Sequence, residues 1–466
     1  MGQIPSISTV GELRASGHLQ KPLRLEIRDN LLEKLRAGED PWPGLYGFEN
    51  TVIPQLERAL IAGHDVVLLG ERGQGKTRLL RTLVGLLDEW TPVIDGSELG
   101  EHPFDPITHA SRRRALELGD ALPVTWRHRD ERYVEKLATP DTSVADLIGD
   151  VDPMKVAEGR SLGDPETIHF GLVPRSHRGI VAINELPDLA ERIQVALLNV
   201  MEERDIQIRG YVLRLPLDVL IVASANPEDY TNRGRIITPL KDRFGAEIHT
   251  HYPIELDAEV AVIRQEAGLV ADVPNHLIEI LARFARNLRE STAVDQRSGV
   301  SARFAIAAAE TLAAAALHRA AMQEEDEAVA EAVARPVDLD SAVDVLGGKV
   351  EFETGEEGRE SEVLSHLLRT ATADTVREHF RGLDFGPLVE AIEHGVTVAT
   401  GVQVTARDFL AELPLLGESE LYEDVWDRLN AQTPGQRAAA LELALEGLYL
   451  ARKIGKETDG SDTVYG

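Results

Sequence analysis

The sequence predicts an α/β fold in which a parallel sheet, covered by helices on both faces, precedes a long all-helical region. Short, wholly apolar segments, such as Val66 to Leu69 and Val219 to Ala223, alternate with helical patterns in the first half of the chain. Strands of this kind are typical of a parallel sheet, because helices bury both of its faces. From Leu256 onward the pattern is helical, and no further strand is expected.

Length and composition narrow the class of protein. The chain has 466 residues, which favours two to four domains. It contains no cysteine, and this excludes disulfides, thiolate zinc sites and cysteine nucleophiles. The net charge of −30 disfavours a broad nucleic-acid-binding face, because an acidic surface repels phosphate. No membrane span and no signal-peptide core is evident, so we expect a cytoplasmic protein.

Four segments are expected along the chain. An N-terminal helical leader occupies 1–42, and the α/β core follows at 43–255. A helical segment, 256–350, ends at a polar break, and a helical C-terminal region with a polar, disordered tail occupies 351–466. Within the core we interpret 96–140 as an insertion of loops and one helix.

A glycine-rich loop follows the first apolar strand. Its G-x-x-x-x-G-K-T pattern, between a strand and a helical pattern, predicts a phosphate-binding loop. The loop consists of Gly70, Glu71, Arg72, Gly73, Gln74, Gly75, Lys76 and Thr77. Backbone N–H groups would bind the β-phosphate of ATP, Lys76 would reach the β- and γ-phosphates, and the Thr77 hydroxyl would bind Mg²⁺. The alternative interpretation is a glycine-rich turn before an ordinary helix.

Two later strand ends supply candidate groups for hydrolysis. Glu185 follows the strand at 180–183, and its carboxylate is our candidate base for activating water. Asn226 follows the strand at 219–223, where its amide would hold the attacking water. The alternatives are a surface glutamate at a helix N-terminus and simple turn chemistry at Ser-Ala-Asn-Pro. Between the two strands, the alternating segment 206–216 predicts a hairpin.

Together these motifs resemble the AAA+ ATPases, in the branch that contains the magnesium chelatase ATPase subunit and the MoxR-like proteins. The resemblance covers about residues 43–350. The motifs that carry it are GERGQGKT (70–77), DLIGDVDP (146–153), FGLVPRSHRGIVAINE (170–185), ASANPE (223–228), LKDRF (240–244) and GVSARF (299–304). Their combination is more specific than any one of them, and it implies an AAA+ core followed by a helical lid.

The resemblance also implies roles for individual residues. Asn226 would be sensor one, and Arg303 would be sensor two on the helical lid. Arg243 would be an arginine finger that reaches the γ-phosphate of the neighbouring subunit, which implies a homo-oligomeric ring, usually a hexamer. The alternatives are an ion pair between Arg243 and Asp242 or another acid, and an ordinary exposed position for Arg303.

The chain departs from the family at one strand end, where the usual Asp-Glu pair is Asn184-Glu185. In the family the aspartate orients Mg²⁺ through its waters, so Asn184 removes one formal charge beside the metal. At ~4 Å and an effective dielectric constant of ~20, such a charge pair is worth at most ~4 kcal/mol. We therefore expect weaker Mg²⁺ binding and slow turnover, with nucleotide binding retained. The alternative is that Asn184 merely caps the following helix.

The function implied by the resemblance is that of a Mg²⁺-ATP-dependent ring ATPase that remodels or activates a partner protein, with assistance to metal insertion left open. The partner commonly carries a von Willebrand factor A domain in this branch. Alternatives are the magnesium chelatase ATPase subunit of tetrapyrrole synthesis, and a nucleotide-gated scaffold with little turnover. An enhancer-binding transcriptional activator is disfavoured, because residues 140–178 contain no Gly-Ala-Phe-Thr-Gly-Ala loop and no terminal helix-turn-helix is evident.

Overall fold

The computed structural model divides into two compact units, Met1–His251 and Tyr252–Gly466, and each is described by itself. The described residues are 3–158, 167–203, 206–208, 211–213, 215–226, 235–295, 299–323, 332–414, 420–459 and 462–466. Two residues of the ASANPE motif, Pro227 and Glu228, and parts of the expected hairpin therefore lie outside the described residues.

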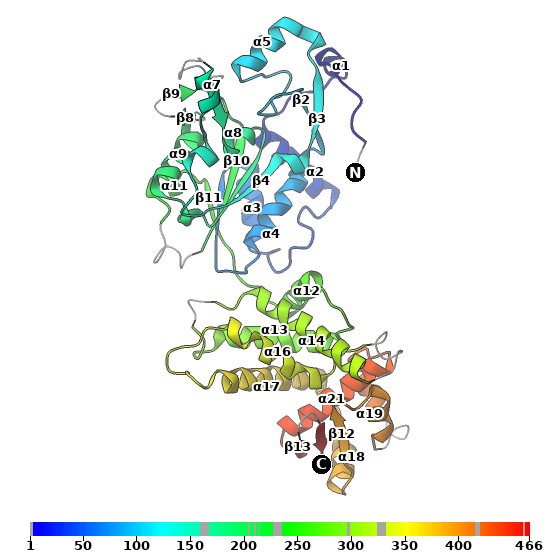
Figure 1. The fold of residues 1–466 in the computed structure, drawn as a ribbon. Coiled ribbons are helices and arrows are strands. Elements are labelled where there is room, and N and C mark those ends of the chain that lie inside the picture. Colours follow the sequence, from blue (N-terminus) through cyan, green and yellow to red (C-terminus); the bar gives the residue numbers. More distant parts are fainter. Residues whose placement is uncertain are drawn as a thin grey trace. The chain divides into compact units, whose positions relative to one another are not determined.

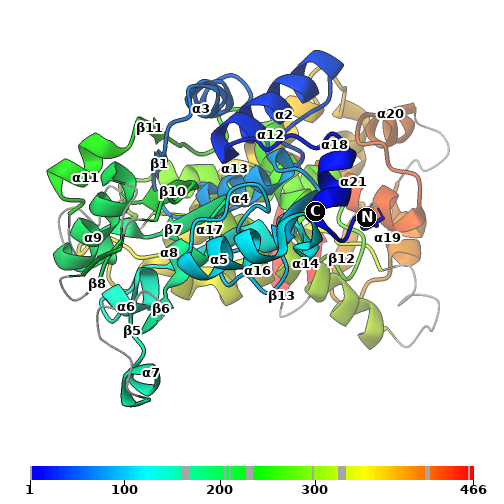
Figure 2. The ribbon, with the colours of Figure 1, turned by 90° about the horizontal axis from the view of Figure 1, so that it is seen from above.

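The first unit is built on a five-stranded sheet with the order β11-β1-β10-β7-β4 (Figures 1 and 2). All neighbouring strands in this sheet are parallel. The strands are β1 (Val66–Leu69), β4 (Tyr133–Leu137), β7 (Gly179–Asn184), β10 (Val219–Ala225) and β11 (Ala246–His249). Because they are parallel, their carboxyl ends lie at one edge of the sheet. The predicted parallel α/β core is confirmed.

Helices cover both faces of this sheet, as Figures 1 and 2 show for α3 and α9. Alternate residues of β1 enter different cores: Val66 and Leu68 pack with one set of helices, and Val67 and Leu69 with the other. The first set is α2 (Leu23–Ala37), α3 (Val52–Ile61) and α4 (Lys76–Thr82), and the second includes α9 (Glu191–Glu203) and α11 (Thr238–Arg243). The wholly apolar strands of the sequence follow from this two-sided burial.

The segment 96–140 contains more structure than the loops and one helix that we expected. It holds α5 (His109–Leu118), β3 (Val124–His128) and β4, and β4 is an edge strand of the core sheet. The expectation was wrong because β4 is only partly buried and keeps polar residues between its apolar ones, so it lacks the apolar run of the central strands. β3 pairs antiparallel with β2 (Trp90–Ile94) in a separate ribbon.

Smaller elements surround this core. The N-terminal α1 is Val10–Ala15. The others are α6 (Val144–Leu147), β5 (Gly149–Val151), α7 (Pro153–Ala157), β6 (Ile168–Phe170), α8 (Leu172–Arg175), β8 (Ile206–Ile208) and β9 (Tyr211–Leu213). β8 pairs antiparallel with β9 inside the segment that was expected to form a hairpin.

The second unit is largely helical, and one cluster of buried apolar residues extends through it from Val260 to Tyr465. Its helices are α12 (Leu256–Glu266), α13 (Asn275–Glu290), α14 (Ala302–Met322), α16 (Leu339–Leu346), α17 (Glu360–His379), α18 (Gly386–Glu393), α19 (Ala406–Glu412), α20 (Glu420–Arg428) and α21 (Pro434–Leu450). None of the helices in the described ranges is long and apolar enough to cross a membrane.

We expected the polar C-terminal tail to be disordered, and this expectation was wrong. Apart from 460–461, which lie outside the description, the C-terminal segment forms β13 (Lys456–Asp459) and β14 (Asp462–Tyr465). β14 also pairs with β12 (Val398–Gly401), so the three strands form a small antiparallel sheet. The polar composition gave the wrong prediction because only a few residues of this sheet, among them the buried Tyr465, pack into the apolar core.

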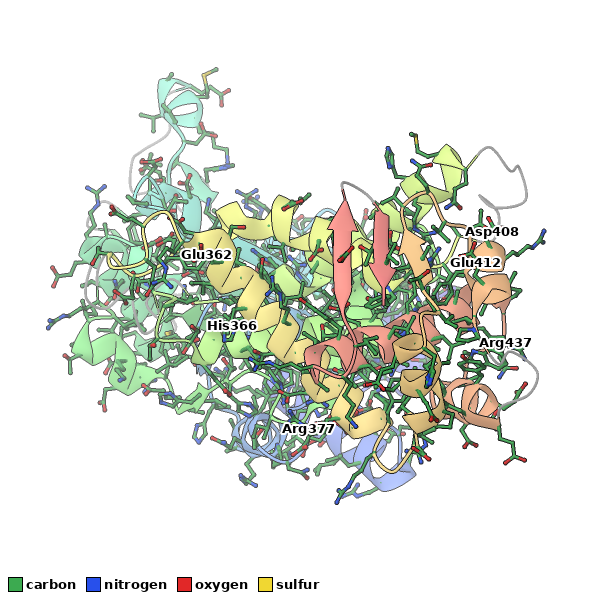
Figure 3. The ribbon with its side chains drawn as sticks, turned by 90° about the horizontal axis from the view of Figure 1, so that it is seen from below. Glu362, His366, Arg377, Asp408, Glu412 and Arg437 are labelled. Atoms are coloured by element: carbon green, nitrogen blue, oxygen red, sulfur yellow. The ribbon has the colours of Figure 1, made fainter. Side chains whose placement is uncertain are left out.

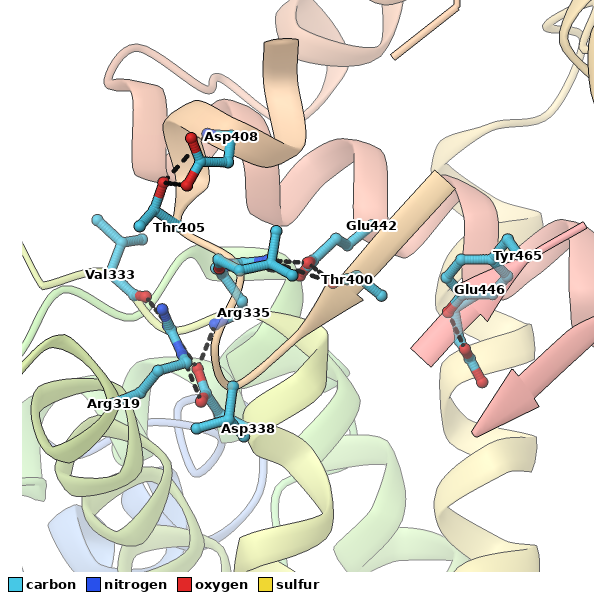
Figure 4. A network of polar contacts seen from close by, with 12 residues as sticks. Arg319, Val333, Arg335, Asp338, Thr400, Thr405, Asp408, Glu442, Glu446 and Tyr465 are labelled. Atoms are coloured by element: carbon cyan, nitrogen blue, oxygen red, sulfur yellow. Dashed lines mark hydrogen bonds and ion pairs between the residues drawn. The ribbon is translucent and has the colours of Figure 1, made fainter. Parts of the chain in front are cut away.

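Buried ion pairs connect the parts of the second unit (Figure 4). Arg335 is 1% exposed and pairs with Glu442 of α21, while its backbone N–H donates to Asp338 at 2.8 Å. Asp338 in turn accepts from Arg319 of α14 at 2.9 Å. Each of these charges is compensated by a partner, which is the condition for burying it without a large loss of stability.

The outer face of α17 is polar. Figure 3 shows Glu362, His366 and Arg377 projecting from this helix, and all three are exposed. On the opposite side of α17, Leu364 and Leu368 are buried in the apolar cluster. α17 is therefore an amphipathic helix that closes the core of the second unit.

A buried histidine makes the second unit sensitive to acid. His276 of α13 is 2% exposed, and within the described part of the chain neither ring nitrogen has a hydrogen-bond partner. Burial lowers the pKa of His276 to about 3. Between pH 6.5 and about 3 the unfolded chain binds this proton and the folded chain does not, so the free energy of unfolding falls as the pH falls through that window.

We therefore expect His276→Leu to reduce the pH dependence of unfolding between pH 7 and 5, by up to about 1.4 kcal/mol per pH unit. Denaturant titrations at both pH values measure this. The control is His366→Leu, which removes an exposed histidine from α17. An unchanged slope in His276→Leu would show that this side chain does not govern acid stability.

Candidate nucleotide-binding site

The glycine loop connects β1 to α4 at the carboxyl edge of the sheet. Gly73 and Gly75 both have φ of 75°, a left-handed conformation that favours glycine. A Cβ atom on Gly70 would lie only 2.0 Å from Thr250 Oγ1. The Gln74 side chain braces the loop, because its Oε1 accepts from the Glu71 N–H at 3.0 Å and from the Thr250 hydroxyl at 2.8 Å. The glycines are therefore required by the shape of the loop.

Lys76, the first residue of α4, is buried and directed across the loop. Its Nζ donates to the carbonyl oxygens of Gly70 at 2.5 Å and Glu71 at 2.7 Å. It also donates to Oδ1 of Asn226 at 2.8 Å. A buried ammonium group ringed by carbonyl oxygens is poised to exchange them for stronger, charged acceptors such as phosphate.

Asn226 connects Lys76 to Glu185. It follows β10 and is 1% exposed, and its Nδ2 donates to Oε2 of Glu185 at 2.6 Å. The amide therefore presents its oxygen to a cation and its N–H₂ group to a carboxylate, as its polarity requires. The structure thus brings together three residues that the sequence analysis selected from three separate motifs.

Glu185 has an unusual backbone conformation. Its φ is 57°, in the left-handed region that residues other than glycine rarely adopt. Such a conformation costs on the order of 1–3 kcal/mol and occurs preferentially at functional sites. The simpler interpretation, a surface glutamate that merely begins the following helix, does not account for this strain or for the contact with Asn226.

Asn184 lies beside the site, but both of its polar atoms have protein partners. Its Nδ2 donates to Oε1 of Glu135 on β4 at 2.8 Å, and its Oδ1 accepts from the Ser224 hydroxyl at 3.1 Å. Glu135 is also held by a forked contact with Arg81 of α4, at 2.7 and 3.0 Å. The hydrogen bonds from Arg81, and to a smaller extent the one from Asn184, keep the pKa of the Glu135 carboxyl below its usual value.

The residues at this edge fit ATP and Mg²⁺. Mg²⁺ prefers hard oxygen ligands, and the Thr77 hydroxyl in the first turn of α4 and the Glu185 carboxylate are such donors. The loop N–H groups and Lys76 are suited to phosphate. Gly75, at the start of α4, leaves the helix N-terminus open to an anion.

The two arginines are placed differently. Arg243, the last residue of α11, is exposed, and its guanidinium donates to the Met201 carbonyl of α9 at 3.0 and 3.3 Å. This contact, rather than an ion pair with Asp242, fixes its position. Arg303 is an exposed residue at the start of α14, in the second unit.

Four residues around the site were missed by the sequence analysis, and they are Arg81, Glu135, Ser224 and Thr250. Glu135 was hidden in the segment that we interpreted as irregular, because residues 133–137 show no alternation of polar and apolar residues that would indicate a strand. Arg81 lies on the helix predicted after the glycine loop, Ser224 lies in β10 although the strand was expected to end at Ala223, and Thr250 directly follows β11. Only their side-chain contacts, which join distant parts of the sequence, reveal them.

Comparisons with known proteins agree with the motifs. Residues 159–243 match the family model described as the Sigma-54 interaction domain. The chain is 28% identical over 208 residues to the magnesium-chelatase subunit ChlI of Guillardia theta, covering 43% of this chain and 55% of the relative. It is 27% identical over 268 residues to the chloroplastic ChlI of Nicotiana tabacum, covering 56% of each chain.

A solved complex of the magnesium chelatase subunits BchI and BchD matches with 22% identity and a TM-score of 0.36, over 69% of this chain and 98% of that chain. The matched part of the chain spans about half the length of these two ChlI subunits. By sequence, the chain is therefore similar to the AAA+ ATPases of the magnesium chelatase branch.

Proposed function

We propose that this protein is a Mg²⁺-ATP-dependent ATPase that works as a homo-oligomeric ring and remodels a partner protein. The observation that carries the proposal is the hydrogen-bonded series Lys76–Asn226–Glu185 at the carboxyl edge of the sheet. It joins a phosphate-binding cation to a candidate base through an amide. The similarity to magnesium chelatase ATPase subunits supports the same activity.

In this mechanism, phosphate oxygens replace the loop carbonyls that Lys76 contacts. The Thr77 hydroxyl and the Glu185 carboxylate would hold Mg²⁺, and the ion would supply positive charge beside the β- and γ-phosphates. Glu185 accepts a proton from the attacking water, and the Asn226 amide orients that water. The strained backbone of Glu185 directs its carboxylate toward Asn226 in advance of the reaction.

The ring is proposed because a second cation is needed at the γ-phosphate. Arg243 is exposed and anchored to the end of α9, a position from which it would reach the site of a neighbouring subunit. Charge stabilisation by such an arginine is worth roughly 10³–10⁵ in rate. A hexamer is the expected assembly, and Arg303 would act as a sensor in the same subunit.

The partner is proposed by analogy with the relatives. A role as a magnesium chelatase ATPase subunit, or as a MoxR-like chaperone, would each require a partner, and a protein with a von Willebrand factor A domain is the expected one. Residence in the cytoplasm is part of the same proposal. A nucleotide-gated scaffold with slow turnover is the second candidate, and Asn184 in place of an acid favours it.

The first test concerns the loop. Lys76→Ala should weaken ATP binding by roughly 10- to 100-fold, because it removes charge-assisted hydrogen bonds worth about 1.5–3 kcal/mol. Titration with a fluorescent ATP analogue measures the affinity. The matched control is Lys241→Ala, which removes an exposed cation that pairs with Glu247 instead. Equal affinities in all three proteins would contradict the assignment of the loop.

The second test concerns the ring. Arg243→Ala and Glu185→Gln should each lower turnover by about 10³-fold, because each removes one half of the site at every interface. Mixing the two variants should restore part of the activity, since some interfaces then combine an intact Arg243 with an intact Glu185. Size-exclusion chromatography confirms that the subunits mix. Mixed rings as inactive as either variant would show that Arg243 does not act across an interface.

A further inference from the structure

Asn184 occupies the position where the family carries an aspartate, and both polar atoms of its side chain form hydrogen bonds. Its N–H₂ group donates to Glu135 and its oxygen accepts from Ser224. An aspartate has no N–H₂ group, so it could not donate to Glu135. The side chain at 184 is therefore matched to an acid on the next strand.

Glu135 reaches Asn184 because of the register between β4 and β7. Glu135 pairs with Ala182, and Asn184 lies two residues further along β7 and hence on the same face of the sheet. The two side chains are diagonal neighbours across the strands. Glu135 therefore places a carboxylate beside Asn184 from the neighbouring strand.

Arg81 connects Glu135 to α4, the helix that also carries Thr77. Arg81 and Thr77 are four residues apart on α4 and share one face of that helix. Four residues correspond to about 6 Å along the helix axis. Arg81 holds Glu135 in a fork, and it therefore links this carboxylate to the helix whose first turn carries Thr77.

The same contacts reach the candidate base. The Ser224 hydroxyl donates to Asn184, and its oxygen lies 3.4 Å from the backbone N–H of Glu185. The contacts Glu135–Asn184–Ser224 therefore lead from an acid on β4 to the strained residue that we propose as the base. Ser224 is 2% exposed, so water does not compete strongly for this contact.

We propose that Glu135 is a positioning residue: Arg81 fixes its carboxylate, which holds Asn184 and, through Asn184 and Ser224, holds Glu185. The inference rests on the proposed function. It also means that the pair Glu135–Asn184, and not position 184 alone, must be exchanged to recover the arrangement of the family.

The experiment is a double-mutant cycle with Asn184→Asp, Glu135→Gln and the double variant. Asn184→Asp places two carboxylates against each other, where wild type has 2.8 Å between Nδ2 and Oε1. Glu135→Gln leaves two amides and no acid. The double variant exchanges the acid and the amide and keeps the hydrogen bond. Glu247→Gln, which removes an acid of β11, controls for the loss of charge alone.

Two readouts are used. The first is the midpoint of thermal unfolding without nucleotide, which reports the contact itself. The second is the Mg²⁺ concentration for half-maximal binding of a fluorescent ATP analogue, which does not depend on turnover. Each single variant should need about ten-fold more Mg²⁺ than wild type, and the double variant should return to within about three-fold of it. The unfolding midpoint should show the same rescue.

The inference is overturned if the effects of the two single substitutions simply add, or if Asn184→Asp alone lowers the Mg²⁺ requirement. Failure of the proposed function looks different, since wild type itself would then bind no nucleotide. If only thermal stability is rescued and the Mg²⁺ requirement is not, the pair is a structural contact and Glu135 has no part in the site.

Discussion

Parallel pairing of β4, β7, β10 and β1 is the constraint on which the rest of the first unit depends. Parallel strands place all of their carboxyl ends at one edge of the sheet. Residues 41 to 150 positions apart in the sequence, such as Lys76, Glu185 and Asn226, therefore meet without any local signal between them. Burial on both faces fixes the register, because a slip by one residue would exchange the two apolar cores.

The sequence was sufficient to predict the central strands and the groups that follow them. Val66–Leu69 and Val219–Ala225 are wholly buried, so their apolar runs are unmistakable. The glycine-rich pattern then selected Lys76, and position at a strand end selected Asn226 and Glu185. The edge strand β4 was missed because one-sided, partial burial allows polar residues within it. In the C-terminal sheet, β13 and β14 were missed because they are short and largely polar, and β12 was missed because it is only four residues long.

Contacts within the site were beyond reach of the sequence for a different reason. The chain shows which residue types follow each strand, but it does not show which side chain accepts a hydrogen bond from which. The φ of 57° at Glu185 and the brace between Gln74 and Thr250 are properties of the packed state. Both are forced on the chain by neighbours from other strands, and neither residue type predicts them on its own.

Asn184 illustrates how far a position-by-position comparison can mislead. Considered alone, Asn184 lacks the negative charge of the aspartate that the family carries, and the expected consequence is weaker binding of Mg²⁺. In the structure its amide donates to the carboxylate of Glu135, which lies on the neighbouring strand β4. The quantity that electrostatics constrains is the charge within a few ångströms of the site, not the residue at one position, because Coulomb energy depends on distance. Here the carboxylate beside Asn184 is itself paired with Arg81, so the charges of all three residues must be considered together.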